Sequence, residues 1–235
     1  MAPSRNRMQP LVALSALRRL IANPQRTDEV FSVIRALSGP ALENAYTRFA
    51  TTETGRKILA EDTNLLDTLL DRKQLSQHGP NTLAHHYLNF VTTENITADG
   101  LVEASEDSEL QDLKGGIHLF GCRQRDMHDL WHTMTQYGTD ELGEVCLLAF
   151  TYAQTRNRGV GVICLTGCFK LAKFYGTGVF AAAWRAYKDG KRAAWLPAQD
   201  WEALLSQPIA EVRRALQIKE PDNYRELRAE FAVAS

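Results

Sequence analysis

The sequence has no apolar run long enough to cross a membrane. Its longest candidate, GVGVICLTGCF at residues 159–169, is followed at once by Lys170. A helix that spans a bilayer needs about 20 apolar residues. Any association of this chain with a membrane is therefore expected to be peripheral.

The chain also lacks a dominant charge. Its formal net charge is −1 over 235 residues, so no global field attracts nucleic acid, and no nucleic-acid partner is expected. Cysteines are few and no signal peptide precedes them, which favours buried free thiols in a reducing compartment over disulfides. The cysteines are Cys122, Cys146, Cys164 and Cys168.

Alternating strand patterns are nearly absent, and no internal repeat occurs. Apolar residues instead recur at helical spacing, for example Val30, Ile34 and Leu37 ahead of Gly39. The length fits one domain. The pattern predicts an all-α protein, a single-domain helical bundle over residues 1–235, with residues 1–9 flexible.

Acids are missing from residues 1–27, which contain five arginines. An apolar stripe behind Pro10 predicts a helix over residues 10–22. Three interpretations of this segment stay open: a mitochondrial transit peptide, a helix lying on an anionic membrane, or a solvated helix packed on the domain. The stripe consists of Leu11, Leu14, Leu17 and Ile21, with Arg18 and Arg19 beside it.

Two histidines and several acids are concentrated in RDMHDLWHTMTQYGTDELGE, residues 125–144. His128 and His132 lie about 40° apart around a helix and one turn apart along it, so both imidazoles can reach one ion. Asp129 lies about 60° from His132 by rotation and can reach the same side. On a continuous helix Glu144 would lie roughly 18 Å away.

Residues 137–140 predict that this helix stops and a second one starts. Gly138 is expected to take the left-handed conformation that ends the first helix, and Thr139 or Asp140 to cap the second. Such a hairpin returns Glu144 to the histidines, and Gly143 permits close approach of the two helices. The sequence thus predicts a metal site on a helical hairpin. Alternatively, the acids of this segment only complement helix dipoles at amino termini.

Residues 159–183 hold five glycines and many small apolar residues. Small residues let helices approach closely, and they can equally leave a tunnel floor that accommodates an apolar ligand. Basic residues follow this segment and are either a solvated helix end or a contact for anionic lipid. These are Arg185, Lys188, Lys191 and Arg192.

The stretch from RDMHDLWH through YGTDELGE resembles the signature of the coenzyme Q biosynthesis protein 4 family, in its bacterial branch. The carboxyl-terminal WRAYKDGKRAAWLPAQDWEALLSQPIAEVRRAL and the amino-terminal TDEVFSVIRALSGPALENAYTRF are similar to the family as well. The resemblance covers about residue 10 to Tyr224. One departure is Ala84, where the family often has glycine ahead of a tyrosine that matches Tyr87.

The resemblance implies metal ligands at His128, Asp129, His132 and Glu144. It implies zinc, while the ligand types also suit iron or manganese. Asp129 is either a ligand or a group outside the ligand set that orients a histidine or carries a proton. No substrate-binding residue is assigned.

The function implied by the resemblance is decarboxylation with hydroxylation at ring carbon 1 of a polyprenylated 4-hydroxybenzoate-type precursor. A carbon–carbon lyase, or decarboxylase, of ubiquinone biosynthesis is therefore expected. The alternative is a non-catalytic scaffold that binds a prenyl lipid and organises the biosynthetic enzymes around a structural metal. Expected partners are the polyprenylated benzoquinone precursor, other ubiquinone biosynthesis proteins, a membrane surface and a second copy of the chain in a homodimer.

The expected location is peripheral, on the cytoplasmic face of a bacterial inner membrane, with residues 10–22 retained and folded. In a eukaryote it is the matrix side of the mitochondrial inner membrane. Arg18 and Arg19 are expected to contribute to binding of anionic lipid.

Overall fold

Helices dominate the structure, a computed structural model that describes residues 8–23, 26–96 and 113–232. No β-strand occurs among these residues, although Thr82 and Pro208 form an isolated antiparallel bridge. The all-α prediction is confirmed. The chain divides into two compact units, each with its own helices and core. The single-domain organisation stays a prediction, and most of the segment expected to be flexible, residues 1–7, lies outside the described residues.

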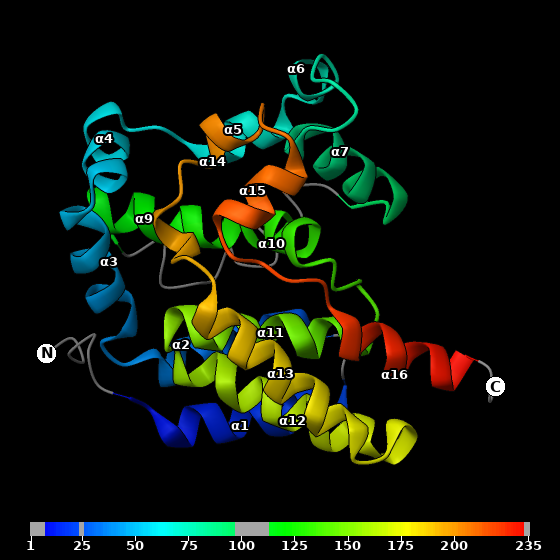
Figure 1. Ribbon diagram of the computed structural model, residues 1–235. Coiled ribbons are helices and arrows are strands. Elements are labelled where there is room, and N and C mark those ends of the chain that lie inside the picture. Colours follow the sequence, from blue (N-terminus) through cyan, green and yellow to red (C-terminus); the bar gives the residue numbers. More distant parts are fainter. Residues whose placement is uncertain (1–7, 24–25, 97–112, 233–235) are drawn as a thin grey trace, which may run out of the picture. The chain divides into compact units, whose positions relative to one another are not determined.

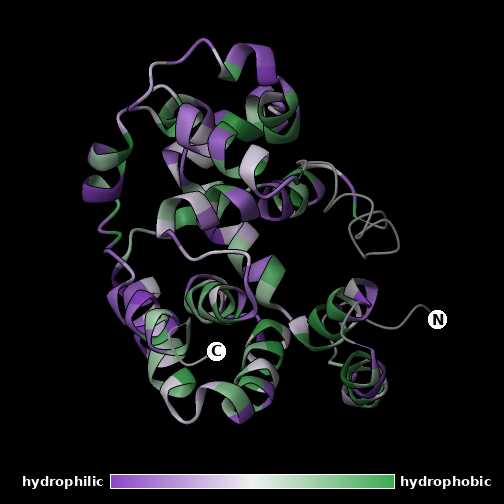
Figure 2. Cartoon of the chain, turned by 90° about the vertical axis from the view of Figure 1, so that its right-hand side faces the viewer, coloured by the Kyte–Doolittle hydropathy of each residue, from purple (hydrophilic) through white to green (hydrophobic). Residues whose placement is uncertain are grey.

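The first unit takes in Met1–Ala41, Thr135–Ala194 and Gln217–Ser235. In Figure 1, α11, α12 and α13 run side by side, and α1 lies along α2. Both apolar and polar residues occur along each of these helices (Figure 2). The helices are α1 (Pro10–Ala22), α2 (Thr27–Ser38), α11 (Glu141–Thr155), α12 (Arg158–Tyr175), α13 (Gly178–Arg192) and α16 (Asp222–Ala232).

Glycines bring the helices of this unit unusually close together. A Cβ added at Gly159 of α12 would lie 2.4 Å from the Cα of Ile34 in α2. One added at Gly190 of α13 would lie 2.7 Å from the carbonyl oxygen of Phe150 in α11. At these positions no residue other than glycine fits without a shift of backbone. The contact at Gly159 therefore favours close packing of helices, rather than a tunnel for a ligand, as the role of this small residue in the 159–183 segment.

The α1 helix, predicted over residues 10–22, buries its small residues and exposes its large ones. Ala13 and Ala16 are 4% and 0% exposed, whereas Leu11 and Ile21 are 81% and 62% exposed. Leu17 of the predicted stripe packs against a core cluster that includes Val33 and Ile163. Most of the apolar stripe is thus surface rather than core.

The second unit takes in Leu42–Met134 and Trp195–Leu216. Phe49, Ile58 and Phe120 form a buried cluster in it. Its helices are α3 (Ala41–Thr51), α4 (Glu53–Glu61), α5 (Leu65–Leu70), α6 (Arg72–Leu75), α7 (Leu83–Thr93), α9 (Gly116–Asp126), α10 (His128–Thr135), the 3-10 turn η2 (Leu196–Ala198), α14 (Trp201–Leu204) and α15 (Ile209–Ala215).

The cysteines are free thiols, as predicted, and Cys146, Cys164 and Cys168 are buried. Burial raises the pKa of Cys146 far above its ordinary value, so this thiol stays protonated and packs as a small apolar group. In the part of the chain that the structure describes, no helix combines the length and the apolar character needed to span a bilayer.

Candidate metal centre

The α10 helix presents both candidate histidines on one side. Leu130 and Met134 on its other side are fully buried and hold it in the second unit. The rings of His128 and His132 have centroids 4.7 Å apart and planes inclined by 70°. The predicted one-turn spacing therefore brings the two imidazoles together.

The carboxyl end of α10 is fixed by Arg213 of α15. Its Nε donates to the carbonyl of Met134 at 2.9 Å, and its Nη2 donates to the carbonyl of Thr133 at 2.8 Å. A helix end leaves such carbonyls without partners in the helix, and the guanidinium also offsets the negative end of the helix dipole. The last turn of α10, directly after His132, is thereby held in place.

Residues 136–140 separate α10 from α11. The left-handed residue is Gln136, with φ of 61°, and not Gly138, so the prediction for that glycine was wrong. The chain reverses two residues earlier than glycine preference indicated, directly after the end of α10 at Thr135. Asp140 caps α11 as predicted, because its Oδ1 accepts a hydrogen bond from the amide of Gly143 at 3.1 Å.

The turn is further held by Tyr224 of α16. Its hydroxyl donates to Oδ2 of Asp140 at 2.5 Å and accepts from the amide of Gly138 at 3.1 Å. A Cβ added at Gly143 would lie 2.1 Å from the carbonyl oxygen of Gly138. The sequence predicted that Gly143 permits close approach of the two helices. In the structure the group that approaches Gly143 is the backbone of Gly138, in the turn before α11. These contacts fix the first turn of α11, and Glu144 lies in that turn.

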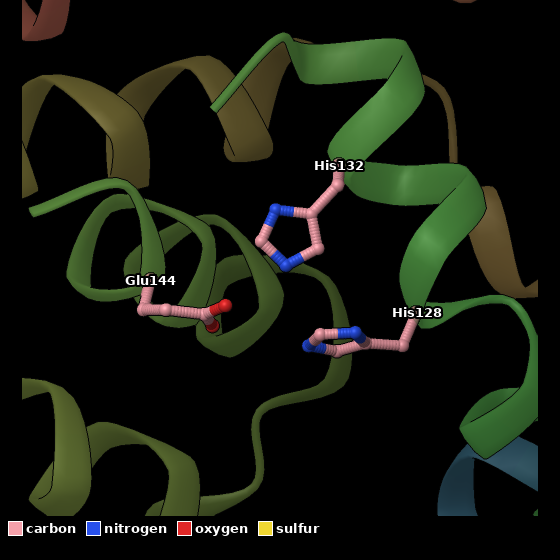
Figure 3. Close-up of side chains that lie close together, drawn as sticks. All are labelled: His128, His132 and Glu144. Carbon is pink, nitrogen blue, oxygen red and sulfur yellow. The ribbon is translucent and has the colours of Figure 1, made fainter. Parts of the chain in front are cut away.

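His128, His132 and Glu144 point toward one another (Figure 3). Each offers one ligand atom, and these atoms all lie within 4.8 Å of one another. His132 is 1% exposed, while the other two are partly exposed. Ligand atoms bound tetrahedrally at about 2.1 Å from one ion are roughly 3.4 Å apart, so donor atoms within 4.8 Å of one another are near that spacing. Two imidazole nitrogens and a carboxylate are a donor set suited to zinc, iron or manganese.

Asp129, the fourth predicted ligand, contacts His128. Its Oδ1 lies 3.1 Å from Nδ1 of that ring. With a proton on Nδ1, the imidazole donates to the carboxylate and presents Nε2 to an ion, which is the usual arrangement of a carboxylate that orients a metal-binding histidine. The acid is 6% exposed, so it is largely protected from water.

Two aromatic residues of α7 line the same part of the second unit. Phe90 stacks on His132, with ring centroids 5.5 Å apart and planes inclined by 19°. Tyr87 is 1% exposed, and burial, together with the charges of Asp129 and Asp126, raises its pKa far above the ordinary value of 10.0. Tyr87 was singled out by family resemblance. Phe90 was missed, because it lies 42 residues before His132 and no spacing pattern links them.

The helix that carries Tyr87 is also where the sequence departs from the family. Ala84 is fully buried, and its amide donates to the carbonyl of Leu205 at 2.9 Å. The methyl group of alanine is therefore accommodated in the core of the second unit.

Comparison with known protein families gives a match over nearly the whole chain. The profile of the family described as Coenzyme Q (ubiquinone) biosynthesis protein Coq4 matches residues 3–222. That range contains the two histidines, Asp129 and Glu144.

Several relatives named ubiquinone biosynthesis protein COQ4, mitochondrial, are similar along most of the chain. The protein from Phaeosphaeria nodorum is 30% identical over 218 residues, which cover 88% of this chain and 70% of the relative. That from Podospora anserina is 28% identical over 213 residues, covering 88% of this chain and 68% of the relative. A homologue from Culex quinquefasciatus is 28% identical and covers 85% of this chain and 71% of the relative.

A solved structure shares the fold. It is the crystal structure of a protein from Nostoc punctiforme assigned to ubiquinone biosynthesis, which superimposes with a TM-score of 0.65 at 19% identity. The superposition covers 91% of this chain and 100% of that one. At this identity the similarity establishes the fold alone.

Proposed function

The chain belongs to the coenzyme Q (ubiquinone) biosynthesis protein Coq4 family, and from that premise we propose that it catalyses a metal-dependent oxidative decarboxylation. The substrate is a polyprenylated 4-hydroxybenzoate-type precursor. The reaction removes the carboxyl group from ring carbon 1 and places a hydroxyl group there, as a carbon–carbon lyase. The observation that carries the proposal is the meeting of donor atoms from His128, His132 and Glu144 within 4.8 Å.

The overall chemistry needs an oxidant. The bond between ring carbon 1 and the carboxyl carbon breaks, carbon dioxide leaves, and a new bond to oxygen forms. With dioxygen as oxidant, one oxygen atom enters the ring hydroxyl, and two electrons and two protons from a donor convert the other to water. A proton carrier close to the reacting carbon is therefore required.

His128, His132 and Glu144 would hold the cation, with Asp129 either as a fourth ligand or as the acid that orients His128. A divalent cation held by these residues would supply Lewis-acid chemistry toward the substrate carboxylate. If dioxygen is activated at this centre, the ligand set has to hold iron or manganese, because zinc has no redox chemistry.

The residues of the chain have distinct tasks in this proposal. Asp129 would carry a proton, a role that its contact with His128 supports. Phe90 fixes the plane of His132 from α7. Tyr87, protonated because of its raised pKa, can donate a hydrogen bond in the same part of the unit without becoming a base.

We extend the proposal to location and partners. A polyprenylated substrate resides in a membrane, and the first unit exposes large apolar side chains, Phe169 and Trp184 among them. The protein would bind peripherally to the cytoplasmic face of a bacterial inner membrane or to the matrix side of the mitochondrial one. There it would act together with other ubiquinone biosynthesis proteins. The chain itself would form a homodimer.

Product analysis tests the chemistry. A strain lacking the protein should accumulate the carboxylated prenyl precursor. His132→Ala, or the isosteric Glu144→Gln, at normal protein abundance should fail to restore ubiquinone, whereas His86→Ala on the exposed side of α7 should restore it. Restoration by the first two variants would refute catalysis at this centre and favour the scaffold function.

A further inference from the structure

A strip of exposed and partly buried aromatic side chains crosses the first unit over α11, α12 and α13. Phe169 packs edge-on against Phe180 with centroids 5.3 Å apart, and one turn further along α13 Trp184 stacks on Tyr187 at 5.3 Å. Tyr187 in turn stacks on Tyr152 of α11 at 5.9 Å. We call this strip, with Leu165 one turn before Phe169, the aromatic ridge.

Three large apolar side chains of the ridge are more than half exposed and so contribute little to the core. Leu165, Phe169 and Trp184 are 52%, 63% and 60% exposed. The core of the unit is formed by the opposite face of α12, where Cys164, Cys168 and Leu171 are buried. A contiguous group of large exposed apolar side chains marks a binding surface.

Lysines border the ridge at both ends. On α12, Leu165, Phe169 and Lys173 follow one another at intervals of four residues, and on α13 Phe180, Trp184 and Lys188 do the same. Residues four apart share a helix face. The two helices run in opposite directions, since Phe169 meets Phe180 across the turn between them. Lys173 and Lys188 therefore lie at opposite ends of the strip.

The surroundings of the ridge are cationic. From Arg156 to Lys188 the sequence has six basic residues and no acid. Lys170 is paired with Glu141, and Arg185 lies 3.5 Å from Asp189. Within the described residues, the lysines that border the ridge have no ion-pair partner.

We propose that the aromatic ridge is the membrane contact of this protein, and that it inserts into the headgroup region of an anionic bilayer. Tryptophan and tyrosine favour this region because their rings are apolar and their polar groups remain hydrated, and flanking lysines pair with anionic headgroups. The inference rests on the proposed peripheral attachment to the membrane and is independent of the proposed decarboxylation.

Charge argues against a second copy of the chain as the occupant. Two ridges packed together would bring the bordering lysines of like charge next to one another, while the nearby acids, Glu141 and Asp189, are already paired with Lys170 and Arg185. The α1 helix competes less well for the membrane. Its large exposed apolar side chains are all aliphatic, with no aromatic ring among them, and its Arg19 is held by the buried Glu29.

Flotation with vesicles tests the proposal on the intact protein. The probes are vesicles of phosphatidylcholine alone and of phosphatidylcholine with about one third phosphatidylglycerol. Phe169→Ser/Trp184→Ser should lower the partition coefficient by about tenfold or more on both kinds of vesicle. Lys173→Glu/Lys188→Glu should lower it by at least about fivefold per lysine on anionic vesicles and leave neutral ones unaffected.

Two matched variants serve as controls. Phe174→Ser removes an equally exposed phenylalanine, 67% exposed, from a different side of α12 and should float like the wild type. Leu11→Ser/Ile21→Ser removes the exposed apolar residues of α1. Loss of flotation in this variant but not in Phe169→Ser/Trp184→Ser would overturn the proposal in favour of α1.

Two further outcomes would also overturn the proposed membrane contact. Wild type that does not float overturns both this face and the membrane attachment, while product analysis decides the decarboxylation separately. A dimer that dissociates in Phe169→Ser/Trp184→Ser would identify the ridge as an interface between copies and overturn the proposal.

Fluorescence places a ridge residue in the bilayer directly. Of the four tryptophans, Trp184 is 60% exposed, Trp195 is partly buried, and Trp131 and Trp201 are buried. Anionic vesicles should shift the emission of Trp184 to the blue, and lipids brominated on the acyl chain should quench it. Trp184→Phe should abolish both signals yet retain most of the binding. Signals that survive this substitution would show that another part of the molecule inserts.

Discussion

Phe90 lies nearly flat against His132, with ring centroids 5.5 Å apart and planes inclined by 19°. The phenylalanine comes from α7 and the histidine from α10, so the stack limits the rotation of the buried imidazole about its side-chain bonds. A ligand that is already oriented loses less freedom when it binds an ion. Phe90 is thus a positioning residue for the proposed metal centre.

Removal of this stack should weaken metal binding without removing a ligand. Phe90→Leu should lower the affinity for a divalent ion by about tenfold, the lower end of what outer groups contribute. Phe90→Tyr keeps the ring and should restore the affinity. Phe49→Leu, a substitution in the core of the same unit, controls for stability. Titration with cobalt, followed by its visible absorption, measures affinity and geometry together. Equal affinity in Phe90→Leu and wild type would refute a positioning role.

The ligand set itself makes a second prediction. We expect one divalent ion per chain, detected by elemental analysis of protein purified under anaerobic conditions. Glu144→Ala combined with His132→Ala should abolish it, because one imidazole is left, while His86→Ala should retain it. Asp129→Asn should retain the ion with lower affinity if the acid orients His128. A stoichiometric metal in the double variant would place the site elsewhere in the chain.

Several features of the site could be predicted from local sequence, because they depend on local geometry. One-turn spacing placed His128 beside His132, and capping preference offered Thr139 or Asp140 as the cap of α11, of which Asp140 is the one that caps it. The left-handed residue could not be predicted in the same way. Glycine is favoured in that conformation, but the chain reverses at Gln136, where α10 ends.

Contacts made over long sequence separations were beyond prediction from spacing. Arg213 fixes α10 and Tyr224 fixes the turn, each from about 80 residues further along the chain. The amphipathic pattern of α1 correctly predicted a helix, yet not its buried face. Ala13 and Ala16 pack inward because small residues allow α1 to approach α2 closely. Which stripe of a helix is buried depends on its neighbours, and these cannot be identified from spacing alone.

The cap of α11 makes a third prediction. Asp140→Ala removes the acceptor of the Gly143 amide and of the Tyr224 hydroxyl, and should lower the free energy of unfolding by about 1 kcal/mol. Asn157→Ala removes the equivalent cap of α12, where the side chain accepts from Gly159, and should cost a similar amount. Only Asp140→Ala should also weaken metal binding, because Glu144 follows that cap within about one turn. Equal metal affinity in both variants would show that the cap acts on stability alone.

The ion pair between α1 and α2 makes a prediction about pH. Arg19 donates to both carboxylate oxygens of Glu29, with Nε at 2.5 Å and Nη2 at 2.8 Å. These hydrogen bonds hold the pKa of Glu29 below its ordinary value of 4.5. Since the folded state has the lower pKa, the stabilisation is complete above the unfolded value and is lost as the pH falls through the folded one.

Glu29→Gln should therefore be less stable than the wild type at pH 7, and the difference should shrink as the pH falls through and below the ordinary value of 4.5. Denaturant unfolding at a series of pH values measures this difference. Arg18→Ala, next to the pair but outside it, should change stability by the same small amount at every pH. A difference between Glu29→Gln and wild type that is constant from neutral to acid pH would show that the carboxylate charge does not stabilise the contact between α1 and α2.

Because Arg19 is held in this pair, Arg18→Glu alone is the charge reversal that tests membrane binding by α1 on vesicles without breaking the contact between α1 and α2.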